Sequence, residues 1–364
     1  MQKERLQSLD VFRGGTIAAM IMVNNQASSE AYPQLMHAQW HGWTFTDLVF
    51  PFFLWIVGIA ITFSFAKRIE LGGNRSKLLL HVVKRSAIIF GVGLLLNGFP
   101  YYNLATIRIS GVLQRIAICY LIAATIFLFT RTRGRILWCV GLLSAYWILM
   151  KVVPVPGCGA GSFAIDCNFE KWIDGMLLSG HMYSRTKTWD PEGLVSTLPA
   201  ITNVLFGIFA GQLLRLPRTA AEKASWLFFA GAVLTFSGLM LSTWIPINKS
   251  IWTSPYAVFT SGLAFTVFAC CFWLVDVLAW RRFTRPFVIY GLNALAVYVF
   301  SGLLARMLGL IKVGEASLGR LIWDHGFSWI GSPSFASLLY SLCHVGVCWL
   351  FALWLYRRNW IVRA

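Results

Sequence analysis

Residues 45–66 read FTDLVFPFFLWIVGIAITFSFA, an apolar run in which Asp47, near the start, is the only charged residue. A helix needs about 20 predominantly apolar residues to cross the hydrocarbon core of a bilayer. Working outward from this stretch in both directions, we find similar runs along the whole chain. The candidate spans are 11–24, 45–66, 80–98, 111–130, 136–153, 195–214, 224–245, 256–280, 286–308 and 335–356. The sequence therefore predicts an all-α fold, a polytopic bundle of about ten transmembrane helices.

The composition supports a membrane protein over a soluble one. Only 12% of the 364 residues are charged and 57% are hydrophobic, whereas soluble domains average about 25% charged residues. The net charge of +17 is carried by short Lys and Arg clusters between the apolar runs, which indicates membrane topology and argues against nucleic acid as a partner. Several of the 17 Trp residues stand at run ends, where membrane lipid headgroups favour such rings.

The orientation follows from the Lys and Arg of alternate connecting segments. Twenty of these residues fall in one set of segments and nine in the other. Positive residues hold segments on the cytoplasmic side. We therefore expect both termini in the cytoplasm and an even number of spans.

We expect one transmembrane domain, 1–364, with outer loops near 25–44, 154–194 and 307–334. Loops of this length often carry function. Cys158 and Cys167 lie in the second loop and are able to form a disulfide if that loop faces an oxidising compartment. No Cys and His spacing resembles a structural zinc site, so we expect no metal.

Polar groups at membrane depth are candidates for function because they are costly there. Arg13 and Asn24 lie in the first run, Asn25 ends it, Arg115 starts the fourth, and Asn293 lies in the ninth. The alternative for each residue is a structural role, in which its side chain reaches the membrane interface or pairs two helices. For Arg13 the functional and the structural interpretation have equal support. Arg115 requires a carboxylate, a carbonyl or a ligand anion as its partner.

The densest polar stretch is HAQWHGWTFTDLVFP, residues 37–51. It places His37 and His41 close in sequence to Asp47, at the expected outer surface. A neutral His is suited to accept a proton from an attacking group, and a carboxylate nearby fixes its tautomer. The alternative is a pair of interfacial His residues beside aromatic anchors such as Trp40.

Three segments in combination resemble a known family. They are SLDVFRG (8–14), the stretch 37–58 with its core TDLVFPFF (46–53), and GVLQRI (111–116). Together they resemble the heparan-α-glucosaminide N-acetyltransferase family of transmembrane acyltransferases, most closely its shorter bacterial members. The resemblance is strong over about the first third of the chain.

The resemblance implies transfer of acetyl from cytosolic acetyl-CoA to the amine of a glucosamine-type sugar, across a bacterial inner membrane. It assigns catalysis to His37, and it matches the oxyanion-binding Asn to Asn24, with Asn25 as an alternative. Asp47 is a supporting or substrate-binding carboxylate. Asn25, Trp40 and His41 are expected to bind the acceptor, with His41 ranked below His37 because the family pattern has Asn at that position.

The phosphates of coenzyme A cannot enter hydrocarbon, so we expect its nucleotide at the cytoplasmic side. The residues expected to bind acetyl-CoA are Arg13, Lys84, Arg85, Arg115, Arg131, Arg282 and Asn293. Direct transfer and an acetyl-His37 intermediate are both open, and so is a homodimer.

Two other classes fit the same pattern of spans. One is a transporter or flippase for amino sugars, whose sites belong near the bilayer midplane on broken helices. The other is an O-acetyltransferase that uses the same donor and a hydroxyl of a cell-wall glycan as the acceptor.

Overall fold

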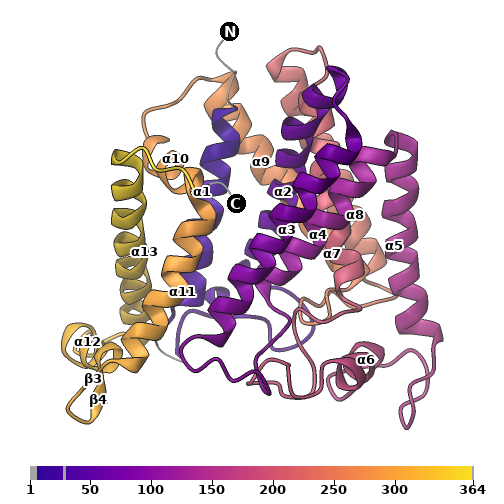
Figure 1. Cartoon of the computed structure of the whole chain (residues 1–364). Coiled ribbons are helices and arrows are strands. Elements are labelled where there is room, and N and C mark those ends of the chain that lie inside the picture. Colours follow the sequence, from indigo (N-terminus) through magenta and orange to yellow (C-terminus); the bar gives the residue numbers. More distant parts are fainter. Residues whose placement is uncertain (1–5, 28–29, 363–364) are drawn as a thin grey trace. The chain divides into compact units, whose positions relative to one another are not determined.

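The computed structural model describes residues 6–27 and 30–362, and these residues are mostly α-helical (Figure 1). This confirms the predicted all-α fold class. The chain divides into two compact units, which are described one at a time. Unit 1 comprises Met1–Ala38, Trp43–Phe53 and Cys270–Ala364, and unit 2 comprises Gln39–Gly42 and Leu54–Ala269.

Eight helices among the described residues are long and apolar enough to cross a membrane. They are α2 (Phe45–Glu70), α3 (Arg75–Gly98), α4 (Val112–Phe129), α5 (Thr132–Val152), α7 (Thr197–Leu214), α8 (Ala220–Leu241), α9 (Ser254–Phe272, extended by the π-helical turn η2, Trp273–Val277) and α13 (Pro333–Arg357). The first predicted span forms the 18-residue helix α1 (Gln7–Asn24), which does not meet the same criterion of apolarity, because its first two turns are polar.

The ninth predicted span, 286–308, is not one straight helix. It consists of α10 (Arg285–Leu292) and α11 (Ala294–Leu310), which meet at an angle of 83°. Asn293 lies at the break, with its side chain donating to Trp360 O at 3.0 Å and accepting from Val362 N at 2.8 Å. The amide therefore binds the backbone after α13 at the point where the helix ladder is interrupted.

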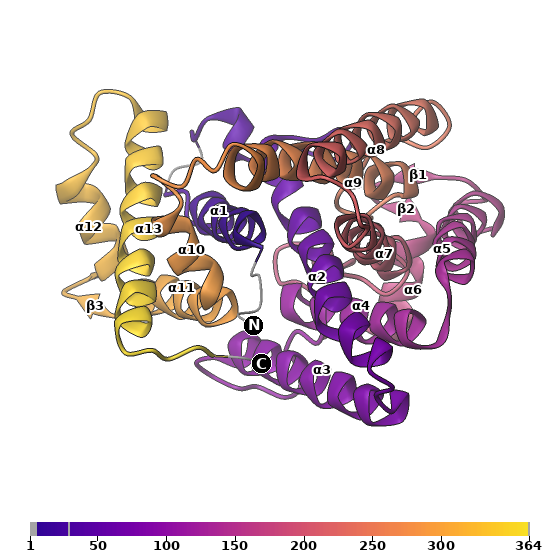
Figure 2. The ribbon, with the colours of Figure 1, turned by 90° about the horizontal axis from the view of Figure 1, so that it is seen from above.

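Unit 1 is built around α1, which lies beside α10 and α11 (Figure 2). Glycine makes this packing close: a Cβ added to Gly14 would lie 1.8 Å from Phe287 O. The same helices form a core with α13 that includes Ile17, Val297 and Cys348. Small residues at helix contacts are typical of membrane bundles, because lipid provides no hydrophobic drive for association.

The remaining elements of unit 1 lie at one end of its helices. They are the hairpin of β3 (Lys312–Val313) and β4 (Ala316–Ser317), the short helix α12 (Leu318–Gly326), and the 3-10 turn η1 (Pro33–Leu35). Figure 1 shows α12 and the hairpin at the ends of α11 and α13. The predicted outer loop near 307–334 therefore has its own secondary structure.

Unit 2 is a bundle in which α7 contacts α4 and α5, and α3 pairs with α4. At Gly207 a Cβ would lie 1.9 Å from Trp55 O, which sets the close approach of α2 and α7. The buried amide of Asn203 donates to Ala257 O at 3.0 Å and to Ser261 Oγ at 2.9 Å. Polar contacts of this kind join helices inside an apolar bundle.

The second predicted outer loop is also ordered in the structure. It contains the hairpin of β1 (Phe163–Ala164) and β2 (Cys167–Asn168), followed by α6 (Phe169–Leu177) at one end of the bundle (Figure 1). Cys158 and Cys167 form a disulfide across nine residues. The pairing that the sequence left open is therefore present.

Candidate functional site

Asp47 lies in the first turn of α2 and is 1% exposed. Its Oδ2 accepts hydrogen bonds from Ala38 N at 3.0 Å and Thr44 N at 3.0 Å, and Thr44 Oγ1 lies 3.1 Å from it. Backbone N–H groups at a helix start point towards such a carboxylate, and the helix dipole favours its negative charge. The carboxylate is thus held in one orientation.

His37 is bound to the other oxygen of this carboxylate. Its Nδ1 lies 2.7 Å from Asp47 Oδ1, and its side chain is 54% exposed. When Nδ1 carries the proton and donates it to a carboxylate, the neutral ring keeps its lone pair on Nε2. An imidazole fixed in this way is able to act as a general base or a nucleophile at the surface.

The backbone before His37 is also attached to the start of α2. Thr44 Oγ1 donates to Met36 O at 2.6 Å, and Thr46 Oγ1 donates to Gln34 O at 3.4 Å. Two hydroxyls from one helix start therefore hold the segment that carries the imidazole. The structure brings His37 and Asp47 together, as the hypothesis of a tautomer-fixing carboxylate requires.

His41 and Trp40 belong to unit 2 and have different surroundings. His41 Nδ1 lies 3.3 Å from Asn248 Nδ2, and burial lowers the pKa of this imidazole. Trp40 Nε1 donates to Phe163 O at 2.8 Å, and its ring meets Trp189 edge-on at 5.3 Å. These two predicted acceptor-binding residues therefore pack against the outer loops of unit 2.

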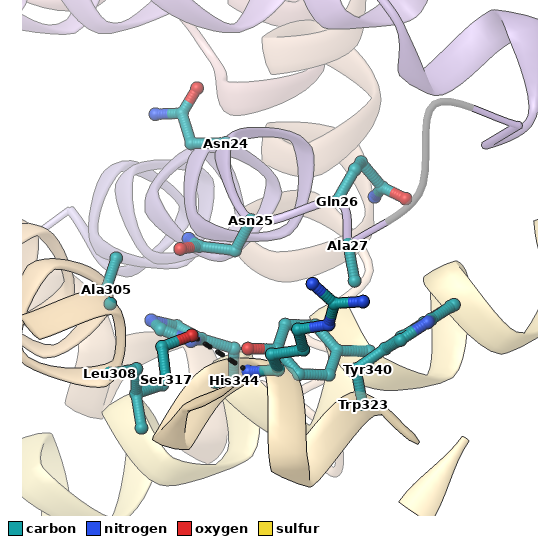
Figure 3. Close-up of a pocket in the computed structure, with 13 residues that line it drawn as sticks. Asn24, Asn25, Gln26, Ala27, Ala305, Leu308, Ser317, Trp323, Tyr340 and His344 are labelled. Atoms are coloured by element: carbon teal, nitrogen blue, oxygen red, sulfur yellow. Dashed lines mark hydrogen bonds between the residues drawn. The ribbon is translucent and has the colours of Figure 1, made fainter. Parts of the chain in front are cut away.

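Asn24 and Asn25 lie at the C-terminal end of α1 and line a pocket at that end of unit 1. Figure 3 shows the Asn24 side chain on the side of α1 away from Tyr340 and His344, and Asn25 on the nearer side. Asn25 Nδ2 donates to Ile21 O at 2.7 Å and to Ser301 Oγ at 3.4 Å. Of the two amides, Asn25 is the one oriented by neighbouring helices.

The predicted cofactor-binding residues of unit 1 differ in the contacts that their side chains already make within the protein. Arg13 Nη1 lies 3.4 Å from both Asp10 Oδ1 and Gly291 O. Asn293 holds the backbone of the C-terminal segment at the helix break. Arg282 is exposed, with its guanidinium 5.5 Å from the Phe283 ring.

In unit 2 the antiparallel α3 and α4 bring the start of α3 and the end of α4 to one end of the bundle. Lys84 and Arg131 are exposed, and Arg85 is half-buried, with its guanidinium 5.1 Å from the Tyr120 ring. Near the same end Arg215 forms an ion pair with Glu70, with Nη2 at 2.8 Å from Oε2. This end carries the basic edge that the sequence predicts.

Arg115 lies at the opposite end of α4 and is 1% exposed. Its Nη2 donates to Gly193 O at 3.1 Å and to Ser196 Oγ, and its guanidinium lies 5.0 Å from the Trp252 ring. The partner that the sequence required is thus a carbonyl, a hydroxyl and an aromatic face. Its Nε and Nη1 have no hydrogen-bond partner among the described residues.

A cluster of buried charges in the loops of unit 2 was not predicted from the sequence. Arg108 donates to Asp190 Oδ2 at 2.8 Å and also to Glu192, and its guanidinium lies 4.5 Å from the Tyr183 ring. Glu170 and Asp174, on α6, are both fully buried. Carboxylates in a long loop look solvated in sequence, and only the amphipathic pattern of 169–177 hinted at a buried face.

The pKa values in this cluster move in opposite directions. Burial raises the pKa of Asp174 to about 6, and burial together with the charge of Asp174 raises the pKa of Glu170 well above its usual range. Burial acts the same way on Asp190, but hydrogen bonding and charge from Arg108 outweigh it and lower that pKa. One carboxylate thus forms an ion pair, while the other two are harder to ionise than a solvated carboxylate.

The fold and the residues described so far define a multi-pass membrane protein with a carboxylate-bound histidine at the start of one span. The sequence model of the family described as "Heparan-alpha-glucosaminide N-acetyltransferase, catalytic" matches residues 5–239, a range that includes His37 and Asp47. The chain belongs to this family, as the resemblance predicted.

Two curated relatives carry the name heparan-alpha-glucosaminide N-acetyltransferase. The human protein is 28% identical over 81% of this chain and 52% of its own length, and the mouse protein is 27% identical over 81% of this chain and 53% of its own. The chain therefore spans about half the length of the curated relatives it matches.

Proposed function

We propose that this protein is a transmembrane N-acetyltransferase that moves acetyl from acetyl-CoA to the amine of a glucosamine-type sugar. The observation that carries the proposal is the 2.7 Å contact between His37 Nδ1 and the buried Asp47 carboxylate, within the range that matches the family. The names of the human and mouse relatives support the reaction class and the acceptor.

The neutral acceptor amine attacks the thioester carbonyl, and His37 Nε2 accepts the proton that the nitrogen loses as the C–N bond forms. The tetrahedral intermediate collapses with release of the coenzyme A thiolate, which takes the proton from the imidazolium. Asp47 holds the neutral ring in the right tautomer and stabilises the imidazolium when it forms. In the alternative with two steps, His37 Nε2 itself attacks the thioester and passes the acetyl group to the amine.

An amide at the end of α1 donates to the oxyanion of the intermediate, a contact whose loss costs roughly 10²- to 10³-fold in rate. Asn24 is the residue the sequence favours, and Asn25 is the one whose side chain lies among neighbouring helices. Substituting each by Ala separates the two assignments, because only the oxyanion donor affects kcat without changing the acceptor KM.

Coenzyme A enters from the cytoplasmic side, with its phosphates on the basic edge of unit 2 that includes Lys84, Arg85 and Arg131. Arg13, Arg282 and Asn293 belong to unit 1, and their predicted role in binding acetyl-CoA is a separate proposal. The buried Nε and Nη1 of Arg115 lack partners among the described residues, which suits a carbonyl or an anion of a ligand.

The Lys and Arg count supports cytoplasmic termini, and the resemblance to the shorter bacterial members of the family supports a bacterial inner membrane. The disulfide of Cys158 and Cys167 supports an oxidising environment for the outer loops. On this topology His37 faces the periplasm, where the sugar amine is found.

The proposal is tested by acetyl transfer from labelled acetyl-CoA to glucosamine, with purified wild type and His37→Ala in detergent. Transfer that disappears in the variant supports the reaction and its base. Transfer to a glycan hydroxyl but to no amine identifies the O-acetyltransferase. Absence of any transfer, together with sugar uptake into proteoliposomes, makes the protein a transporter.

A further inference from the structure

A pocket at one end of unit 1 is lined by Asn24 and Asn25, the two candidate oxyanion donors, and by residues to which the reaction described above gives no role. It encloses about 370 Å³ between the end of α1, the last turns of α11, α12 and the first turns of α13. Volumes of about 300–1,000 Å³ are typical of small-molecule sites. Apart from the end of α1, its lining lies beyond residue 239, where the match to the family model ends.

One wall of the pocket is aromatic. The half-buried rings of Trp323 on α12 and Tyr340 on α13 meet edge-on at 6.1 Å. Phe327 supports both, at 5.4 Å from the Tyr340 ring and stacked at 6.3 Å from the Trp323 ring. Because three rings from two helices brace one another, the wall presents a fixed apolar face with a phenol and an indole N–H at its edge.

The opposite side is polar and is fixed by hydrogen bonds. Gln26 Nε2 donates to Ser341 Oγ at 3.2 Å, and its Oε1 accepts from Ser337 Oγ at 2.9 Å. Ser301 Oγ lies 3.4 Å from both Asn25 Nδ2 and His344 Nε2.

We propose that this pocket binds a pyranose ring of the acceptor glycan, an inference that rests on the proposed function and specifies its substrate site. A pyranose has an apolar face of C–H groups and a rim of hydroxyls, which match one aromatic wall facing fixed amides. Arg320 at the rim is paired with Asp324 at 3.5 Å, which weakens its attraction for a phosphate headgroup.

The pocket is connected to the segment that leads to His37. Ala27 N donates to Ser337 Oγ at 3.1 Å, and Ser334 Oγ donates to Glu30 O. Both serines lie on α13, the helix that carries Tyr340 and His344. A sugar bound against α13 is therefore held on the same element that anchors the approach to the proposed base, as an acceptor subsite requires.

The test uses the full-length protein in nanodiscs and compares Trp323→Ala with Trp329→Ala. Trp329 is 76% exposed, lies in the same outer segment and does not line the pocket. Binding of glucosamine and of a glucosamine disaccharide is measured by ligand-observed NMR, and transfer kinetics are measured in parallel. We expect Trp323→Ala to weaken binding and raise the acceptor KM roughly tenfold with kcat and the donor KM unchanged, and Trp329→Ala to behave as wild type.

Trp323→Phe keeps a ring face and should retain most of the binding, which separates lost stacking from lost folding. Wild-type binding by Trp323→Ala, equal loss in Trp329→Ala, or displacement of the sugar by phospholipid headgroups would each overturn the subsite. Sugar binding that depends on Trp323 without any acetyl transfer would support the pocket and overturn the proposed reaction. If Trp323→Ala transfers acetyl with an unchanged acceptor KM, the proposal that the pocket binds the acceptor is overturned and the proposed reaction stands.

Discussion

Units 1 and 2 use buried carboxylates in different ways. In unit 1 the buried Asp47 holds His37, whose side chain remains half exposed. In unit 2 the buried Asp190 and the largely buried Glu192 hold Arg108, whose side chain is only 20% exposed. The first arrangement presents a reactive atom to the surface, whereas the second satisfies its charges internally and fixes a loop.

His37 and His41 repeat this contrast at a separation of four residues. His37 is bound by a carboxylate at 2.7 Å, and His41 by a neutral amide at 3.3 Å. A carboxylate stabilises the imidazolium that forms when a base accepts a proton, and an amide does so much less. The hydrogen-bond partner of each ring, and not its place in the sequence, therefore distinguishes the candidate base from the packing residue.

The largest effect is expected from His37→Ala set against His41→Ala. Removing a general base should lower kcat/KM by roughly 10²- to 10⁴-fold, whereas His41→Ala should change it only a few fold. The measurement is steady-state transfer from acetyl-CoA to glucosamine at equal protein stability. Similar losses of kcat/KM in both variants would contradict the assignment of His37, and not His41, as the base.

Asp47→Asn tests the carboxylate in the same pair. The amide no longer stabilises an imidazolium, and its N–H group faces backbone donors, so we expect a loss of roughly 10³-fold in kcat. The pH profile of kcat is the readout, with Asn248→Ala as the matched change beside His41. If the pH profile of kcat is the same in Asp47→Asn as in the wild type, this carboxylate does not fix the tautomer of His37.

Arg108→Ala should act on stability rather than on chemistry. It leaves Asp190 and Glu192 without their cation, and breaking one side of a buried ion pair costs about 3 kcal/mol. Lys171→Ala is the control, because its partner Asp166 is 83% exposed and such pairs contribute about 0–1 kcal/mol. Thermal unfolding in detergent measures both, and equal melting temperatures would contradict the structural role of the cluster.

Removing the disulfide should have a smaller effect. The bridge between Cys158 and Cys167 closes a short loop of nine residues' separation, so chain entropy predicts a loss of about 2 kcal/mol in the double Ser variant. Proteolysis of the outer loop, with and without reductant, measures the loss locally. Reductant should sensitise the wild type and leave the variant unchanged.

The smallest effect concerns pH. Burial raises the pKa of Asp174 to about 6, so the folded chain retains a proton that the unfolded chain releases at lower pH. The free energy of unfolding should therefore fall as the pH rises from about 4 to 6, and the raised pKa of Glu170 should extend this fall to higher pH.

Glu170→Gln removes one of the two titrations without changing the shape of the side chain. We expect it to flatten the pH dependence of the melting temperature and to raise that temperature at pH 8 by roughly 2–4 °C. The control is Asp166→Asn, since that carboxylate is exposed. If the melting temperature of Glu170→Gln still falls with rising pH as it does in the wild type, the Glu170 carboxyl does not contribute to the pH dependence of stability.

The sequence predicted much of the site because its two main residues are close in the chain. His37 and Asp47 are ten residues apart, and the turn into α2 brings them together by local geometry. The Arg108 cluster was not predictable in the same way, because its partners lie more than 80 residues away. The pocket joins residues near position 25 to residues near 320 and 340, a separation over which no local pattern operates.

The sequence by itself determined the helical membrane fold and the family, since apolar run length and short motifs act locally and need no partner. It also determined which loops are able to carry structure, including the pair Cys158 and Cys167. Only the tertiary structure decided that 286–308 breaks at Asn293, that Arg115 binds a carbonyl and a hydroxyl, and that His37 and His41 belong to different units. Each of these depends on which distant backbone or side chain satisfies a buried polar group, and that choice is made by packing.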